Sequence, residues 1–161
     1  MRGGALPPAF LCVSLGLALA PAERRLGMVG VLVLATTATV IAFVPIPRGW
    51  TDTAFLACWL SVALNSAIVH LPRGLGRSGA VVSSLNAGVW TGAMIAPATS
   101  RLDLVIALPC CLSMFLAAWI CKRHGSIAVK VVSSWLIAIA VLAAALQFLP
   151  VTPGYLPDHI E

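Results

Sequence analysis

Charged side chains are scarce in this chain. Only 9% of its 161 residues are charged, whereas a soluble domain carries about 25%. Apolar residues make up 60% of the sequence, and the mean hydropathy is +1.02. A water-facing surface cannot be built from this composition, so the chain belongs among integral membrane proteins and not among soluble enzymes or nucleic-acid-binding domains.

Acidic residues and catalytic motifs are also lacking. The chain has five Asp and Glu residues, none of them in the middle of an apolar run, which argues against a proton-coupled relay. No nucleophile and base constellation, phosphate-binding loop or H-E-x-x-H motif occurs, so no enzymatic activity is predicted. His70, His124 and His159 lie at the end of an apolar run, in a turn and in the tail, where they cannot face one another as haem ligands. No cofactor is expected.

The five cysteines form no C-x-x-C motif and no spaced Cys/His set, so no metal site is predicted. Most of them lie within apolar runs, where a thiol acts as a small packing residue. Cys110 and Cys111 are adjacent in the middle of such a run. Burial at lipid depth denies them the exposure and the nearby positive charge that a reactive thiol needs.

Long apolar runs alternate with short charged turns. A transmembrane helix needs about 20 apolar residues, and cutting the chain at its charges and Pro/Gly clusters yields segments at residues 6–22, 26–46, 53–71, 79–98, 102–121 and 127–149. These runs do not alternate apolar and polar residues, which excludes a membrane β-barrel. We therefore predict an all-α, single-domain polytopic bundle of about six transmembrane helices, in which sequential helices touch. Trp59 and Trp135 are interpreted as interfacial residues.

Basic residues are distributed unequally between the two sides of this bundle. Seven of them belong to the turns after the first, third and fifth segments: Arg24, Arg25, Arg73, Arg77, Lys122, Arg123 and Lys130. Arg2, Arg48 and Arg101 lie on the other side. By the positive-inside rule, the three basic turns face the cytoplasm and both termini are non-cytoplasmic, including a short exported tail at residues 150–161. The compartment predicted is a bacterial-type inner membrane.

Residues 1–20 also have the pattern of a secretory signal, with one Arg, an apolar stretch and then Ala18-Leu19-Ala20. If this segment were cleaved, the seven basic residues would face outward and break the positive-inside rule. A retained first segment is therefore favoured, with cleavage as the alternative.

Several polar side chains fall at similar depth near the predicted cytoplasmic side. Asn65 lies six residues before the end of the third segment and Asn86 seven residues after the start of the fourth, which places both about 9 to 11 Å below one surface. We expect these amides to pair or to share a polar partner. The predicted cluster consists of Asn65, Ser66, His70, Ser83, Asn86 and Lys130. It is either a small-molecule or ion site, in which His70 exchanges protons, or a set of interhelical hydrogen bonds with a snorkelling lysine.

Small residues recur every four positions in the fourth segment. The row consists of Ala80, Ser84, Gly88, Gly92 and Ala96, and Gly88 with Gly92 forms a G-x-x-x-G motif. Such a row lets another helix backbone approach closely. We predict that it faces protein, either within the bundle or across a contact with a second chain.

The absence of soluble domains, catalytic motifs and mid-span carboxylates favours a non-catalytic accessory or anchoring subunit of a larger membrane protein complex. The small-residue row and the tail would be its docking surfaces. The alternative is a small dimeric transporter or flippase with a polar site in the cytoplasmic half of the bundle. The expected partners are lipid and either membrane protein subunits or a second copy, and nucleic acid is not among them.

Overall fold

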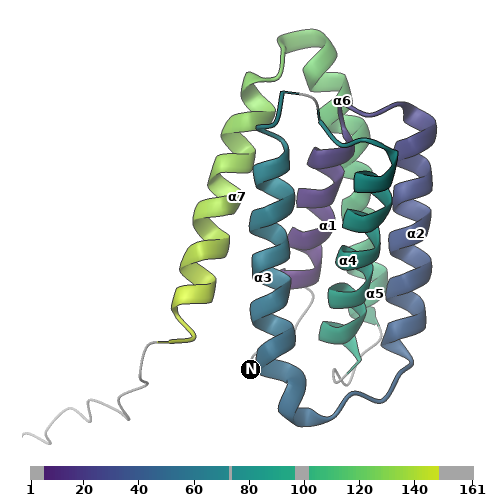
Figure 1. Ribbon diagram of the computed structural model, residues 1–161, viewed down its shortest axis with the longest axis vertical. Coiled ribbons are helices and arrows are strands. Elements are labelled where there is room, and N and C mark those ends of the chain that lie inside the picture. Colours follow the sequence, from purple (N-terminus) through teal and green to yellow (C-terminus); the bar gives the residue numbers. More distant parts are fainter. Residues whose placement is uncertain (1–5, 73, 97–101, 149–161) are drawn as a thin grey trace, which may run out of the picture.

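The computed structural model describes residues 6–72, 74–96 and 102–148, and its regular elements are all helical (Figure 1). The elements are α1 (Leu6–Leu19), α2 (Arg24–Ala42), the 3-10 helix η1 (Arg48–Trp50), α3 (Thr51–Ile68), α4 (Arg77–Ile95), α5 (Leu102–Ala107), the 3-10 helix η2 (Leu108–Leu112), α6 (Ser113–His124) and α7 (Ile127–Ala145). No strand occurs among these residues, so the predicted all-α fold is confirmed. The predicted tail at residues 150–161 lies outside the described residues.

Four helical stretches are long and apolar enough to cross a membrane: α2, α3, α7 and the stretch Asp103–Arg123. The remaining two helices occupy the interior of the bundle. Helix α1 has 14 residues and is therefore about 21 Å long. Helix α4 is longer, but it carries polar residues such as Ser84 and Thr91, both of which are fully buried. This arrangement fits a polytopic membrane bundle, because the buried polar residues of α4 face other helices and not lipid.

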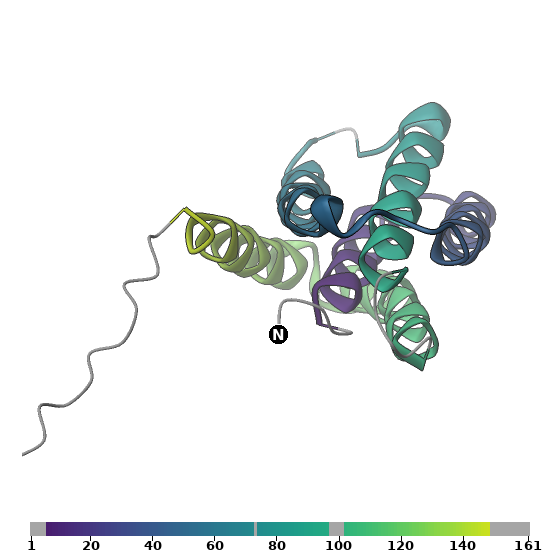
Figure 2. The same cartoon turned by 90° about the horizontal axis from the view of Figure 1, so that it is seen from below.

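Helix α1 lies at the centre of the bundle (Figures 1 and 2). Every residue from Ser14 to Ala20 is buried. Pro7 and Pro8 occupy its first turn, where a missing N–H group breaks no hydrogen bond of the helix. The segment that carries the pattern of a secretory signal thus supplies the middle of the core.

The expectation that sequential helices touch holds for α1 with α2, α3 with α4 and α6 with α7, but not for α2 with α3. Helix α2 packs along α4 and makes almost no contact with α3, whereas α3 packs against α1 and α7. The chain between α2 and α3 contains Pro45 and Pro47, which cannot continue a helix. Figure 2 shows this segment crossing the end of the bundle, which allows α2 to lie beside a helix that comes later in the chain.

The close packing of α4 against α2 depends on glycine. A Cβ atom added at Gly88 would lie 2.7 Å from the Thr37 Cβ and 2.9 Å from the Leu34 carbonyl oxygen. One added at Gly92 would lie 2.7 Å from the Ala38 carbonyl oxygen. The small-residue row therefore mediates a contact within one chain, in which the backbones of α2 and α4 approach each other directly. Ala80, Ser84, Gly88 and Gly92 are buried, and Ala96 at the end of the row is half-buried.

The predicted span at residues 102–121 is not one continuous helix. It is divided into α5, the five-residue 3-10 helix η2 and α6, and Pro109 lies within η2. Proline has no N–H to donate, and its ring clashes with the carbonyl of the preceding turn. The stretch Asp103–Arg123 is still long and apolar enough to cross a membrane, but the tighter helical turns of η2 connect its two halves.

The turns α1–α2, α3–α4 and α6–α7 share one end of the bundle, at the top of Figure 1. We call this the basic end. Its basic residues with described side chains are Arg24, Arg25, Arg77, Lys122, Arg123 and Lys130, all of them exposed. Arg73 belongs to the same turns but, like Arg2 and Arg101, lies outside the described residues.

Candidate binding site at the basic end

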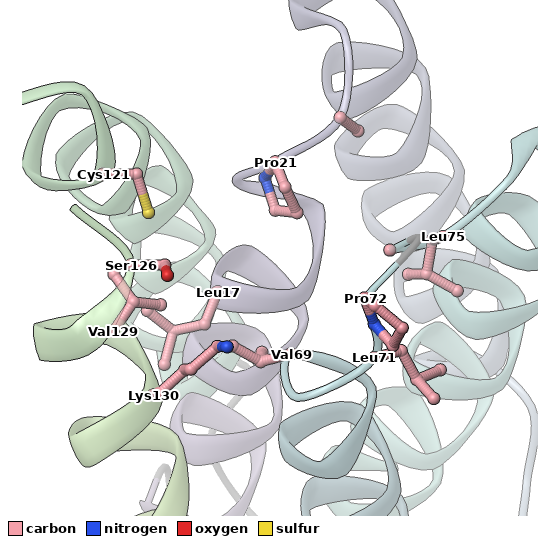
Figure 3. A pocket seen from close by; sticks show the side chains of 12 residues that line it. Leu17, Pro21, Val69, Leu71, Pro72, Leu75, Cys121, Ser126, Val129 and Lys130 are labelled. Carbon is pink, nitrogen blue, oxygen red and sulfur yellow. The ribbon is translucent and has the colours of Figure 1, made fainter.

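A pocket of about 380 Å³ lies at the basic end, where the three turns meet (Figure 3). Pro21 comes from the α1–α2 turn, Pro72 and Leu75 from the α3–α4 turn, and Ser126 from the α6–α7 turn. The ends of α1, α3, α6 and α7 complete the wall. Segments that are far apart in the sequence thus form a single cavity, which we call the basic-end pocket.

Lys130 supplies the charge of this pocket. It lies in the first turn of α7, and its side chain extends across the pocket toward Val69 at the end of α3 (Figure 3). It forms no ion pair among the described residues. An ammonium group without an acidic partner, positioned against apolar walls, is suited to an anionic ligand.

His70 lies beside the basic-end pocket and does not line it. The His70 Nε2 is 3.5 Å from the Ser134 hydroxyl oxygen, and that hydroxyl is also 3.0 Å from the Lys130 carbonyl oxygen, to which it donates. The contact connects α3 to α7 at an exposed position. His70 therefore borders the wall of the pocket, and Val69 and Leu71 on either side of it are the lining residues.

Asn86 does not bond to Asn65 as the sequence predicts. Its amide nitrogen donates to the Ser61 hydroxyl over 2.8 Å, and its amide oxygen accepts from the Trp90 indole N–H over 3.0 Å. Ser61 is absent from the predicted cluster, although it lies one helical turn before Asn65 on the same face of α3. The interhelical hydrogen bond exists, but one turn deeper than predicted.

The six predicted cluster residues are not brought together into one site. Ser61 lies within α3, whereas His70 lies two residues beyond its end, in the turn toward α4. The Ser61 side chain faces α4 and the His70 side chain faces α7. Ser83 is half-buried on α4. A matching depth in the sequence does not specify the direction in which each side chain points.

Asn65 and Ser66 are buried with polar atoms unpaired. Asn65 is 2% exposed and the Ser66 hydroxyl is fully buried, and neither the Asn65 amide nitrogen nor that hydroxyl has a hydrogen-bond partner among the described residues. A buried polar group without a partner costs about 1 to 3 kcal/mol of stability. These two residues reduce the stability of the α3 packing and do not reach the pocket lining.

The adjacent cysteines point in different directions. The Cys111 thiol is buried and interacts with the Cys12 thiol of α1. The Cys110 thiol is half-buried and lies 3.7 Å from the Ile106 carbonyl oxygen within its own span. The thiols of Cys12 and Cys111 are thus packing contacts between α1 and the broken span, consistent with their apolar surroundings.

The polar groups at the basic end include the Lys130 ammonium, the His70 imidazole and the Ser134 hydroxyl. Among the residues that the structure describes, no group of three or more His, Cys, Asp or Glu residues could hold a metal ion. No protein-family model, curated protein or solved structure matches this chain.

Proposed function

We propose that this chain is a small membrane transport protein that receives a small anionic substrate in the basic-end pocket. The observation that carries the proposal is Lys130, which reaches into a pocket of about 380 Å³ without forming an ion pair among the described residues. Small-molecule sites enclose about 300 to 1,000 Å³. The pocket is therefore large enough for one small organic anion, and the lysine supplies the attraction.

The charge around the pocket supports the same substrate class. Five further exposed basic side chains lie at the same end of the bundle, and Glu23 is the one acidic residue in the described part of that end. Charges of one sign around a cavity raise the local concentration of oppositely charged solutes. An anion would meet this field before it reached Lys130.

The orientation of the chain gives the proposal a direction. By the positive-inside rule the basic end faces the cytoplasm, and both termini lie on the other side of a bacterial-type inner membrane. The basic-end pocket would then receive its substrate from the cytoplasm. Export of a soluble anion and flipping of an anionic headgroup both begin at such a site.

The packing of α4 favours the transport function over the accessory-subunit function. The sequence alone favours a subunit, because the small-residue row of α4 offers a docking face. In the structure, Gly88 and Gly92 of that row contact α2 of the same chain. The row is thus occupied, and a partner or a dimer need not be invoked to explain it.

Binding and efflux from reconstituted vesicles test the proposal. Benzoate, methylphosphonate and glycerol phosphate, offered separately to the purified protein, represent three classes of small anion. We expect at least one to raise the melting temperature and to leave vesicles faster when the protein is present. Lys130→Gln should remove both effects while retaining the unliganded melting temperature, because Lys130 is exposed and forms no ion pair among the described residues.

Lys122→Gln is the matched control, because Lys122 is a basic-end lysine that does not line the basic-end pocket. It should retain binding and efflux. Two results would contradict the transport proposal. One is equal anion binding and efflux in Lys130→Gln and Lys122→Gln. The other is that none of the three anions raises the melting temperature or leaves the vesicles faster.

A second candidate, the accessory subunit, is favoured by the outer face of α7. Exposed apolar side chains form a stripe along one side of this helix: Val131, Trp135, Ile139, Leu142 and Leu146. Trp135 is 70% exposed and lies about 12 Å from the start of α7, deeper than the interfacial position interpreted from the sequence. An indole N–H at that depth needs a partner, which a helix of another protein could supply.

Native electrophoresis after extraction in digitonin tests this second candidate. We expect the chain to migrate with a stoichiometric membrane protein and Trp135→Leu to release it. Val141→Ala is the control, because Val141 is also exposed on α7 but lies off the stripe. Migration of the wild-type chain alone would contradict the subunit function and leave the transport proposal unaffected.

A further inference from the structure

A second pocket of about 300 Å³ lies at the basic end, between α1, α2 and α6. Its apolar lining comes from the end of α1 and from one face of α6, and its charged lining residues are Arg24 and Lys122. Ala22 is the one residue that also lines the basic-end pocket. We call this second site the α2–α6 groove.

Aromatic rings of α6 hold arginine side chains at the surface of this groove. The Arg24 guanidinium carbon lies 5.8 Å from the centre of the Phe115 ring, and that of Arg123 lies 5.7 Å from the Trp119 ring centre. A cation over an aromatic face is attracted to it and loses conformational freedom. Neither Arg24 nor Lys122 forms an ion pair among the described residues, so both positive charges are available to a ligand.

An apolar surface leads from the groove toward the middle of the span. Leu112, Phe115, Leu116 and Trp119 are exposed and recur at i, i+3, i+4 and i+7. This spacing places them on one face of the helical stretch that contains α6. Because α6 runs toward the basic end, Leu112 lies deepest and Lys122 lies nearest the surface. The face therefore changes from apolar to positively charged in the direction in which a lipid changes from acyl chain to headgroup.

We propose that the α2–α6 groove binds an anionic phospholipid. The phosphate of the headgroup lies between Arg24 and Lys122, and one acyl chain lies along the apolar face of α6. Two unpaired cations select an anionic over a zwitterionic headgroup, and basic pockets between transmembrane helices on the cytoplasmic side suit such lipids. The proposal depends on charge complementarity in this groove and does not require transport through the basic-end pocket.

Native mass spectrometry in mixed detergent micelles measures this binding directly. The probes are phosphatidylglycerol and phosphatidylcholine with identical acyl chains. We expect the wild type to retain one phosphatidylglycerol in preference to phosphatidylcholine. Arg24→Gln and Lys122→Gln should each weaken binding about fivefold, and the double variant should lose the preference. Lys130→Gln, outside the groove, should bind as the wild type does.

Two further measurements separate lipid binding from other effects. Arg24→Lys keeps the charge while changing the ring contact, so it should bind phosphatidylglycerol more tightly than Arg24→Gln. Glycerol phosphate, which has the headgroup chemistry without acyl chains, should not compete at equal concentration. Equal binding of the two lipids, an unchanged double variant or effective competition by glycerol phosphate would each overturn the proposal. Loss of transport in Lys130→Gln would not contradict lipid binding in the α2–α6 groove.

Discussion

At the scale of single residues, backbone contact at Gly92 predicts a large effect from a single methyl group. A Cβ at this position would lie 2.7 Å from the Ala38 carbonyl oxygen, which belongs to the backbone and cannot rotate away. Gly92→Ala should therefore destabilise the protein by about 1 to 3 kcal/mol, measured as a lower melting temperature in detergent. Gly49→Ala is the control, because no atom lies within 4 Å of a Cβ there. Equal melting temperatures of Gly92→Ala and Gly49→Ala would show that the contact between α2 and α4 can widen without loss of stability.

The polar residues of α3 predict opposite effects from two substitutions. Ser61→Ala removes the hydroxyl that accepts from Asn86 and should cost about 0.6 kcal/mol, the mean for such bonds in membranes. Asn65→Leu replaces a buried amide whose nitrogen has no partner. It should leave the melting temperature unchanged or raise it, because the unpaired group is removed and the volume is nearly retained. A strong loss of stability in Asn65→Leu would show that the amide has a partner, such as a buried water.

At the scale of elements, Pro109 determines how α5 is oriented relative to α6. The five residues of η2 form a 3-10 helix, which rotates about 20° more per residue than an α-helix does. If that stretch became α-helical, α5 would rotate by about 100° relative to α6. Ala107 and Cys111 lie on either side of Pro109 in this stretch, and both are buried.

Pro109→Ala should make α5, η2 and α6 one continuous α-helix, because residue 109 regains an N–H and loses the ring that clashes with the preceding turn. Hydrogen exchange followed by mass spectrometry measures this change, and we expect residues 108–112 to exchange more slowly in the variant. The α2 helix is the control and should exchange at the same rate in both proteins. Unchanged exchange at residues 108–112 would show that packing against α1 maintains the break without the proline.

At the scale of the whole molecule, the three basic turns at one end predict the topology. The predicted six-span topology places three crossings after the basic turn that contains Arg77, at α4, the broken span and α7. Reporter fusions after Arg77 and at Glu161 should therefore report opposite sides, with Arg77 cytoplasmic. A fusion after Arg25 should agree with the one after Arg77, because both residues lie at the basic end. Reporters after Arg77 and Glu161 on the same side would contradict six spans.

The membrane class, the helical fold and the grouping of basic turns could be predicted from the sequence, because hydropathy and charge act locally along the chain. Which helices touch depends on tertiary packing. It placed α2 against α4, where glycines on one helix meet backbone on the other. It also divided the predicted polar cluster, since Asn86 bonds to Ser61 between α4 and α3, whereas His70 contacts Ser134 of α7. The basic-end pocket and the α2–α6 groove arise where separate turns converge, and convergence depends on packing between residues distant in the chain.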